Sequence, residues 1–144
     1  DGPQEYVAKL KDIIVQNDLE GMITFRAPVP RNRMPGVLAD HDALILASEY
    51  EEPLARAIQE AMAMNLLVIG TTTGGSGELL IPDQTGLVFP AGDSLELANQ
   101  IARAIAEPEL MERLISAGRK AVEENFDIRK TVLKVEKYLL HLIA

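Results

Sequence analysis

The sequence predicts an α/β fold, in which a parallel sheet carries helices on both faces and is followed by C-terminal helices. Two runs, ALILA at residues 43–47 and LLVIG at residues 66–70, are continuously apolar, which is typical of strands covered on both sides. Segments with helical spacing of apolar residues separate the strand-like runs, and this alternation favours parallel strands. After Pro90 only helical patterns remain. We therefore expect one domain over residues 1–144.

The N-terminal part is predicted to form a helix, a strand and a second helix. Pro3 suits the first turn of a helix, and apolar residues then recur at helical spacing up to Asn17. Residues 22–26, MITFR, are rich in β-formers and are followed by two prolines, so they predict a short strand. Residues 31–40 predict a short helix before the apolar run at 43–47.

The central stretch repeats the alternation of helix and strand. Residues 54–64 combine alanines with long side chains and predict a helix, which Asn65 ends because asparagine tolerates the left-handed conformation of a helix stop. The strand at residues 66–70 follows, then a short helix over residues 74–80 and a last strand, GLVF, at residues 86–89. Strand and helix thus alternate four times.

Three helices are predicted at the C-terminal end. Asp93 or Ser94 caps the first, Pro108 opens the second, and Asp127 caps the third. Each helix has a single apolar stripe. We expect these stripes to pack against the sheet or against a part of the protein outside this chain.

Composition and charge exclude several functions. The net charge is −8, and acidic residues outnumber basic ones, so no basic surface is left to bind a nucleic acid. The absence of cysteine excludes disulfides and thiolate metal sites and fits a cytoplasmic location. No apolar run is long enough to cross a bilayer. Because the chain starts at Asp1 without a methionine, we expect it to be a piece of a longer protein.

The candidate site lies beyond two predicted strands, because open parallel sheets bind ligands at the carboxyl ends of their strands. Glu52 lies in the loop after the strand at residues 43–47, at the start of a helix. The opening amides of that helix, near Leu54, Ala55 and Arg56, lack helical partners and attract a phosphate group.

Glu60 lies further along the same helix and can serve a different end of one extended ligand. Its neighbours are apolar, so the helix is expected to be mainly buried, and a carboxylate on such a helix is costly unless a partner satisfies it. Ionised carboxylates accept two hydrogen bonds side by side, which matches adjacent hydroxyls of a sugar or ribose. The turn at residues 71–77, TTTGGSG, lets backbone approach closely. Together these features predict a pocket for a nucleotide sugar.

The central stretch resembles the C-terminal, donor-binding domain of retaining glycosyltransferases with the GT-B fold, family 4 type. The signature of that family reads E-x7-E, then A-M-A-x-G-x-P-V-V, a glycine pair and an acid. This chain has Glu52 and Glu60, AMAMNLLVI at residues 61–69, the pair Gly74-Gly75, and Glu78. The signature is therefore present in the same order and with the same spacing.

The resemblance extends over essentially the whole chain. Asp1-Gly2-Pro3 resembles the family's G-D-G-P turn, and residues 42–48 resemble its A-D-V-F-V-x-P-S strand. Residues 85–90 with Asp93 resemble the segment T-G-x-L-V-x-P-x-D. The resemblance implies a Rossmann-like sheet, as in a truncated GT-B C-terminal domain.

The resemblance also implies roles for individual residues. The first glutamate of the signature contacts hydroxyls of the donated sugar and the second holds the ribose, so these roles fall to Glu52, as the catalytic residue, and to Glu60. The other donor-binding residues implied are Leu54, Ala55, Arg56, Gly74 and Gly75, with Ala27 and Val29 beside the base. No metal ion and no other cofactor is implied, and the donor is a UDP-sugar or a GDP-sugar.

Two departures from the family pattern bear on function. Ala55 stands where many members have a glycine, which narrows the approach of backbone to the sugar. The first strand, helix and second strand of the family domain, with the basic residues that neutralise the diphosphate, are expected before Asp1. The N-terminal domain that supplies the acceptor site is expected there as well. We therefore do not expect this fragment alone to catalyse transfer.

The sequence thus predicts part of an enzyme that moves a hexosyl group from a nucleotide donor to an unknown acceptor, with retention of anomeric configuration. One alternative is a non-catalytic module of the same fold that binds a nucleotide sugar or a partner, because residues 53–56 depart from the signature. A second alternative, a flavodoxin-like signalling domain, would need a phosphorylatable aspartate at a strand end. His41 and His141 have no neighbouring ligand set, so neither predicts a metal site.

Overall fold

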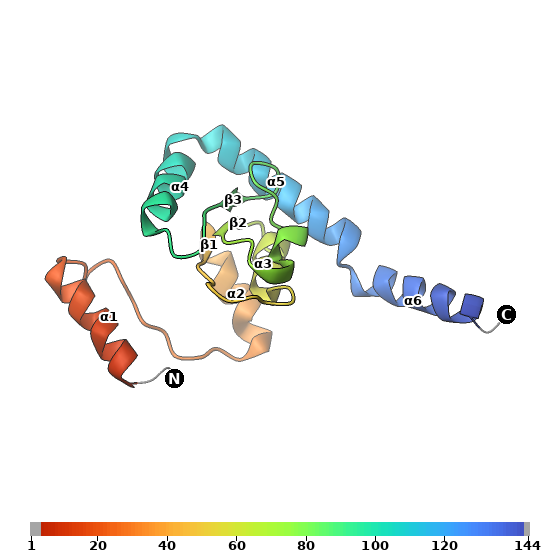
Figure 1. Cartoon of the computed structure of the whole chain (residues 1–144), viewed down its shortest axis with the longest axis horizontal. Helices are drawn as coiled ribbons and strands as arrows, with labels where there is room; N and C mark the ends of the chain where they lie inside the picture. Colours follow the sequence, from red (N-terminus) through yellow and green to blue (C-terminus); the bar gives the residue numbers. More distant parts are fainter. Residues whose placement is uncertain (1–3, 143–144) are drawn as a thin grey trace. The chain divides into compact units, whose positions relative to one another are not determined.

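The computed structural model describes residues 4–142, so the predicted Asp1-Gly2-Pro3 turn lies outside the described residues. The chain divides into two units, Asp1–Arg31 and Asn32–Ala144, and each is described by itself. The first unit holds helix α1, and the second holds the sheet and nearly all the remaining helices (Figure 1). The candidate site described below lies entirely in the second unit.

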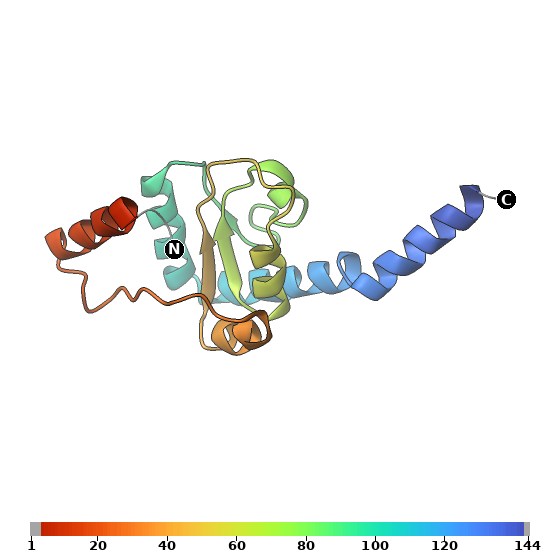
Figure 2. The same cartoon turned by 90° about the horizontal axis from the view of Figure 1, so that it is seen from below.

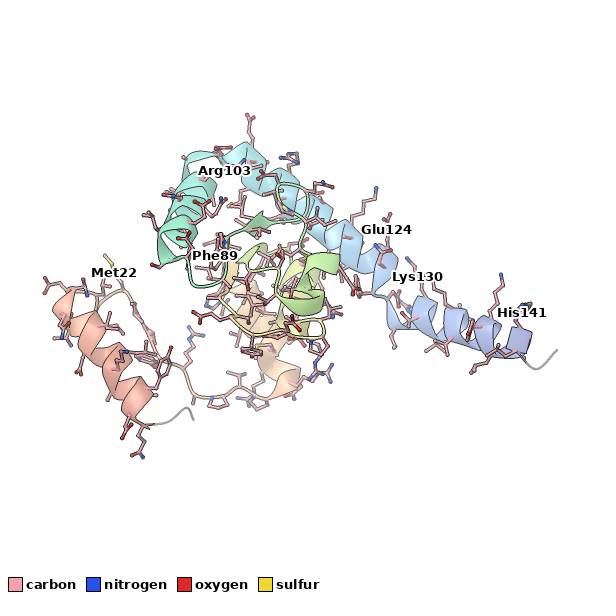
Figure 3. The ribbon with its side chains drawn as sticks, viewed as in Figure 1. Met22, Phe89, Arg103, Glu124, Lys130 and His141 are labelled. Carbon is pink, nitrogen blue, oxygen red and sulfur yellow. The ribbon has the colours of Figure 1, made fainter. Side chains whose placement is uncertain are left out.

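The first unit confirms the predicted helix but not the predicted strand. Helix α1 spans Gln4–Gln16, as the apolar spacing predicts. Residues 22–26, by contrast, form no strand, and Met22, labelled in Figure 3, is 82% exposed. The prediction failed because β-propensity alone does not hold a strand. A strand also needs a neighbour that pairs with its backbone amides and carbonyls.

The sheet of the second unit is parallel, as predicted. Its strands are β1 (Ala43–Leu46), β2 (Leu67–Gly70) and β3 (Leu87–Val88), in the order β1-β2-β3. Ala43 lies opposite Leu67, and Ile69 lies opposite Leu87. The described residues therefore contain three of the four predicted strands, which confirms an α/β fold with a parallel sheet.

The helices of the second unit agree with the predicted order and differ at their ends. Helix α3 begins at Arg56, two residues later than predicted, and residues 74–78 form a 3-10 helix. The full set is η1 (Arg31–Arg33), α2 (Met34–Ala39), α3 (Arg56–Ala63), η2 (Gly74–Glu78), α4 (Ser94–Ala106), α5 (Pro108–Asn125) and α6 (Ile128–Leu142).

Helices cover both faces of the sheet and create two apolar cores. Figure 2 shows the sheet nearly edge-on, with α3 and α4 on opposite sides. In β2, Val68 packs into the core with α3, whereas Leu67 and Ile69 pack into the core with α4. Phe89, labelled in Figure 3, joins the second core and is 3% exposed. The continuous apolar run of β2 is explained by this burial on both faces.

Strand β1 is covered on one face only, which corrects the prediction for residues 43–47. Leu44 and Leu46 pack against the core with α3, but Ile45 points to the other face and is 46% exposed. The reason is that α4 packs on the sheet mainly through β2 and β3. An apolar run predicts what a strand can bury, but neighbouring elements decide how much it buries.

The predicted helix stops and caps are confirmed. Asn65 ends α3 with a φ of 60°. The amide of Asn65 donates to the Met62 carbonyl at 3.2 Å, and the amide of Leu66 donates to the Ala61 carbonyl at 3.0 Å. This is the Schellman arrangement, which pairs the last carbonyls of a helix. Further along, Asp93 caps α4 by accepting from the Glu96 amide at 2.9 Å.

The C-terminal helices divide into packed and unpacked ones. Helix α4 packs on β2 and β3, and α5 packs on α3, α4 and β2. Asp127 caps α6 as predicted, with its carboxylate accepting from the Arg129 amide at 2.9 Å. No residue of α6 within the described range is buried, and its apolar residues, such as Leu133 at 64% exposure, face solvent.

The left-handed conformation of Asn65 leads to a stability prediction. We expect Asn65→Ala to lower the free energy of unfolding by about 1 kcal/mol, because alanine resists positive φ more strongly than asparagine does. Asn65→Gly should stay within about 0.5 kcal/mol of the original chain, since glycine adopts this conformation readily. Urea unfolding monitored by circular dichroism measures both values.

Asn99 offers a matched control for this prediction, because it lies in the exposed middle of α4 with right-handed helical backbone. Asn99→Ala should not destabilise the protein, since alanine has the higher helix propensity. Equal losses at Asn65 and Asn99 would contradict the explanation by backbone conformation.

Candidate functional site

The candidate site is formed where β1 and β2 end. Residues 47–55 connect β1 to α3, and residues 71–73 connect β2 to η2. Because β1 and β2 are parallel neighbours, both connections leave the same edge of the sheet. This edge is where open α/β sheets bind their ligands. The site residues predicted from the central stretch lie in or next to these connections, except Glu60, which lies within α3.

Glu52 is held in the first connection by a short local hydrogen bond. The hydroxyl Oγ of Ser48 donates to Oε1 of Glu52 at 2.6 Å, and the side chain of Glu52 is half-buried. Hydrogen bonding to the Glu52 carboxylate, and then the charge of that carboxylate, raise the pKa of the Tyr50 phenol above its ordinary value. Tyr50 itself is 68% exposed. The Glu52 carboxylate therefore accepts from one hydroxyl of its own connection and influences a second one.

Thr71 ties the two connections together. Its amide donates to the carbonyl of Leu46, the last residue of β1, at 3.1 Å. Its hydroxyl Oγ1 donates to the carbonyl of Ser48 at 2.7 Å. Thr71 is 1% exposed, so both bonds are protected from water. The start of the Glu52 connection is thereby fixed to the end of β2.

The glycine pair makes a second tie at the other end of Glu52. The amide of Gly75 donates to the carbonyl of Glu52 at 2.8 Å. Gly74 has a φ of 58°, and a side chain there would collide with the Glu52 backbone. A side chain at Gly75 would collide with the carbonyl of Pro53. The predicted close approach of backbone at this turn is present, and the approaching backbone is that of Glu52 and Pro53.

The start of α3 is open, as an anion site requires. Ala55 is the residue before the first helical one, it is 4% exposed, and no side chain caps the helix. Ile58 already donates to the carbonyl of Ala55 at 3.1 Å, so the helical amides without a partner in this ladder are those of Arg56 and Ala57. Leu54 and Ala55 precede the helix, contrary to the predicted helix start. The side chain of Arg56 is exposed.

Glu60 lies about one turn inside α3, because the helix begins at Arg56. The prediction placed it on a mainly buried helix, and the structure shows it half-buried, next to the fully buried Ala61. The ion pairs found among residues 4–142 do not include Glu60. Its carboxylate is therefore available to hydroxyl groups of a ligand.

Two predicted site residues are not part of the second unit. Ala27 and Val29 belong to the first unit, where Ala27 is exposed and Val29 is half-buried. The connections and the helix that form the candidate site belong to the second unit. The role of Ala27 and Val29 beside a nucleotide base remains a prediction.

Sequence reasoning missed the hydroxyl residues that hold the site. Ser48 entered the sequence argument only as part of a motif, and Tyr50 and Thr71 were given no role. The signal available was position, because Ser48 comes two residues after β1 and Thr71 comes directly after β2. Hydroxyl side chains at such positions can reach the backbone of the neighbouring connection, since parallel strands end side by side.

The described part of the chain contains neither a candidate metal cluster nor a candidate membrane-spanning helix. Within residues 4–142, no three His, Asp or Glu side chains gather closely enough to hold a metal ion. None of the helices described here has both the length and the apolar character that a bilayer crossing requires.

Comparison with known sequences identifies a family. The sequence profile described as glycosyl transferases group 1 matches residues 2–121. The Bacillus subtilis protein named as glycosyltransferase YtcC is 32% identical over 127 residues, covering 88% of this chain and 31% of that protein. N-acetyl-alpha-D-glucosaminyl L-malate synthase of Bacillus anthracis is 27% identical, covering 94% of this chain and 34% of that protein. The chain thus spans about a third of the length of these relatives.

Comparison with solved structures identifies the fold. The Anabaena protein Alr3699/HepE in complex with UDP superposes with a TM-score of 0.87 at 28% identity, covering 97% of this chain and 38% of that one. The same protein with UDP-glucose gives a TM-score of 0.83. Sucrose-phosphate synthase of Thermosynechococcus elongatus gives 0.84 at 26% identity, covering 94% and 34% of the two chains. Together with the family profile, these likenesses show that the chain belongs to the glycosyl transferases group 1 family and has the fold of the GT-B glycosyltransferases.

Proposed function

We propose that this chain is the donor-binding domain of a retaining glycosyltransferase. In this proposal it binds a nucleotide-diphosphate sugar, and the longer enzyme transfers the hexosyl group to an acceptor held by another domain. The observation that carries the proposal is the position of Glu52. Ser48 holds the Glu52 carboxylate, and the neighbouring connection holds the Glu52 backbone through Gly75. The residues that follow Glu52 lead directly into the open start of α3, so a group for hydroxyls and a group for an anion come close together in the chain.

The diphosphate is assigned to the start of α3. The amides of Arg56 and Ala57 have no helical partner, and the helix dipole places partial positive charge at this end. Such an end binds phosphate groups without any basic side chain. The remaining neutralising charge is assigned, from the family resemblance, to basic residues outside this chain.

The sugar is assigned to Glu52. Its Oε1 atom already accepts from Ser48, and an ionised carboxylate has lone pairs on both oxygens, so acceptor capacity remains for sugar hydroxyls. Hydrogen bonds to a charged acceptor are stronger than those between neutral groups. Glu60, about one turn inside α3, is assigned to the ribose hydroxyls by the same chemistry. The solved complexes of Alr3699/HepE with UDP and with UDP-glucose support a uridine nucleotide as the first donor to test.

The proposed reaction follows from these assignments. As the bond between the anomeric carbon and the diphosphate oxygen breaks, negative charge grows on the diphosphate, next to the α3 amides that stabilise it. Glu52 keeps the sugar oriented while the acceptor hydroxyl attacks from the face that the diphosphate leaves, which retains the anomeric configuration. The hydroxyl passes its proton to the departing diphosphate oxygen on the same face. In line with the family resemblance, the proposal assigns no metal ion to this step.

A binding and transfer experiment on the full-length protein tests the proposal. Isothermal titration with UDP-glucose, UDP-N-acetylglucosamine and GDP-mannose should reveal one preferred donor, with ATP as the control that does not bind. The anomeric configuration of the transferred sugar is then read by NMR. Retention is expected, and inversion would contradict the proposed stereochemistry. Binding without transfer to any acceptor would favour the non-catalytic module. Failure to bind any of the three nucleotide sugars would contradict donor binding and leave only a module that binds a partner.

Substitutions of the two glutamates are expected to affect ligand affinity in different ways. Glu52→Gln should lower the affinity for the preferred nucleotide sugar about 10- to 100-fold, because it removes charged hydrogen bonds to the sugar alone. The affinity for the free nucleoside diphosphate should stay unchanged. Glu60→Gln should lower the affinities for both ligands by similar factors, because both ligands contain the ribose.

Glu51→Gln is the matched control for these substitutions, since Glu51 is an exposed neighbour of Glu52. It should change neither affinity by more than about twofold, as expected of an exposed charge. If Glu60→Gln bound the nucleoside diphosphate as tightly as the original protein does, the ribose assignment would be wrong.

The glycine pair gives a further prediction. Gly75→Ala should abolish nucleotide-sugar binding and lower the melting temperature, because the new methyl group meets the Pro53 carbonyl and displaces the backbone next to Glu52. Gly77→Ala is the matched control, because a methyl group there meets Thr72 at an ordinary contact distance of 3.6 Å. Titration and thermal unfolding of both variants measure the difference. Similar behaviour of the two variants would show that the contact with Pro53 does not matter.

A further inference from the structure

Two hydroxyl-bearing residues connect the core of the sheet to the proposed sugar carboxylate, and a third lies next to that carboxylate. Thr71, at the end of β2, donates its hydroxyl to the carbonyl of Ser48 at 2.7 Å. Ser48 in turn donates its own hydroxyl to Oε1 of Glu52 at 2.6 Å. Tyr50 approaches the same carboxylate from the exposed side. The family comparisons assign no role to these hydroxyl residues.

The direction of the hydrogen bonds follows from counting protons. A threonine hydroxyl has one hydrogen, and Thr71 uses it on the Ser48 carbonyl, which can only accept. Thr73 lies 3.4 Å from Thr71, oxygen to oxygen, so Thr73 must be the donor in that contact. Ser48 likewise uses its hydrogen on Glu52. Each hydroxyl therefore has a defined orientation, and the chain of contacts runs from Thr71 to Glu52.

Thr71 is suited to act as the fixed end of this chain. It is 1% exposed, and its amide continues the β1–β2 pairing by donating to Leu46 at 3.1 Å. Its backbone is therefore as well held as the sheet itself. Ser48 and Glu52, in contrast, lie in a connection without regular structure and are only half-buried. Their positions depend on bonds to other parts of the molecule.

We propose that Thr71 is a positioning residue that sets the place of the Glu52 carboxylate through Ser48, and that this contact determines how strongly the site distinguishes a nucleotide sugar from the bare nucleotide. The inference rests on the proposed role of Glu52 toward the sugar. A glutamate side chain that is already ordered loses less rotamer entropy when a ligand binds. A carboxylate held in place also presents its remaining lone pairs in one direction.

Substitution of Thr71 tests this inference in the full-length protein. Thr71→Val keeps the shape of the side chain and removes the hydroxyl, so Ser48 loses its donor. We expect affinity for UDP-glucose to fall about tenfold, the effect of losing one hydrogen bond that orders a charged acceptor, while affinity for UDP stays within twofold. Thr71→Ser keeps the hydroxyl, so this variant should have the same ratio of the two affinities as the original protein.

Thr85→Val is the matched control. Thr85 is also a buried threonine, and its hydroxyl also donates to a backbone carbonyl, that of Leu79. Both valine variants should lower the melting temperature, since each leaves a buried carbonyl without its donor. Only Thr71→Val should change the ratio of UDP-glucose affinity to UDP affinity.

Amide hydrogen exchange adds a readout that needs no ligand. In Thr71→Val, residues 48–54 and the amide of Gly75 should exchange faster, because the Glu52 connection has lost one of its ties. In Thr85→Val their exchange should be unchanged. Unchanged exchange of residues 48–54 in Thr71→Val, or equal loss of UDP-glucose and UDP affinity, would overturn the positioning role. If Thr71→Val did loosen this segment but Glu52→Gln left the ratio of nucleotide-sugar affinity to nucleoside-diphosphate affinity unchanged, the proposed role of Glu52 would fail instead.

Discussion

The site depends on the direct packing of two connections against each other at the carboxyl edge of the sheet. Gly74 and Gly75 lie so close to the backbone of Glu52 and Pro53 that no side chain fits between them. Hydrogen bonds from Gly75 to Glu52 and from Thr71 to Ser48 hold the same two segments together. Because the contact is largely between backbones, it restricts the position of Glu52 far more than side-chain packing alone would.

The sheet supplies the rigid support for this contact. Strand β2 is buried on both faces, with Val68 in one core and Leu67 and Ile69 in the other. Thr71 follows directly on this strand and is as inaccessible to water as the strand itself. A polar side chain in that position is stable because its hydroxyl has a carbonyl partner. The buried hydroxyl thus transmits the order of the core to a half-exposed connection.

In the proposed function, the tasks of binding are divided along a single short helix. The open start of α3 offers unpaired amides to a phosphate, and Glu52 precedes that start while Glu60 follows it. A ligand with hydroxyls on both sides of a diphosphate matches this order of groups. Carboxylates close to a diphosphate repel it, so the helix dipole has to offset that repulsion.

Much of the fold and the candidate site was predictable from sequence, and the failures share one cause. The helices, the parallel order and the stop at Asn65 depend on short-range patterns of apolar residues and turn formers. The predicted strand at residues 22–26 failed because its pattern describes only one partner of a pairing that needs two. Likewise, the exposure of Ile45 in β1 could not be predicted, because α4, which comes much later in the chain, leaves that face bare.

By itself, the sequence determined the type and order of the elements, the caps, and the signature that connects Glu52, Glu60 and the glycine pair, because these features depend on residues close together in the chain. Only the tertiary structure decided what the glycines face and which buried hydroxyl fixes the backbone of the Glu52 connection. Thr71 lies 23 residues from Ser48, and their hydrogen bond exists only because β1 and β2 pair side by side. Local chemistry specifies which groups are available, and the pairing of strands selects which of them meet.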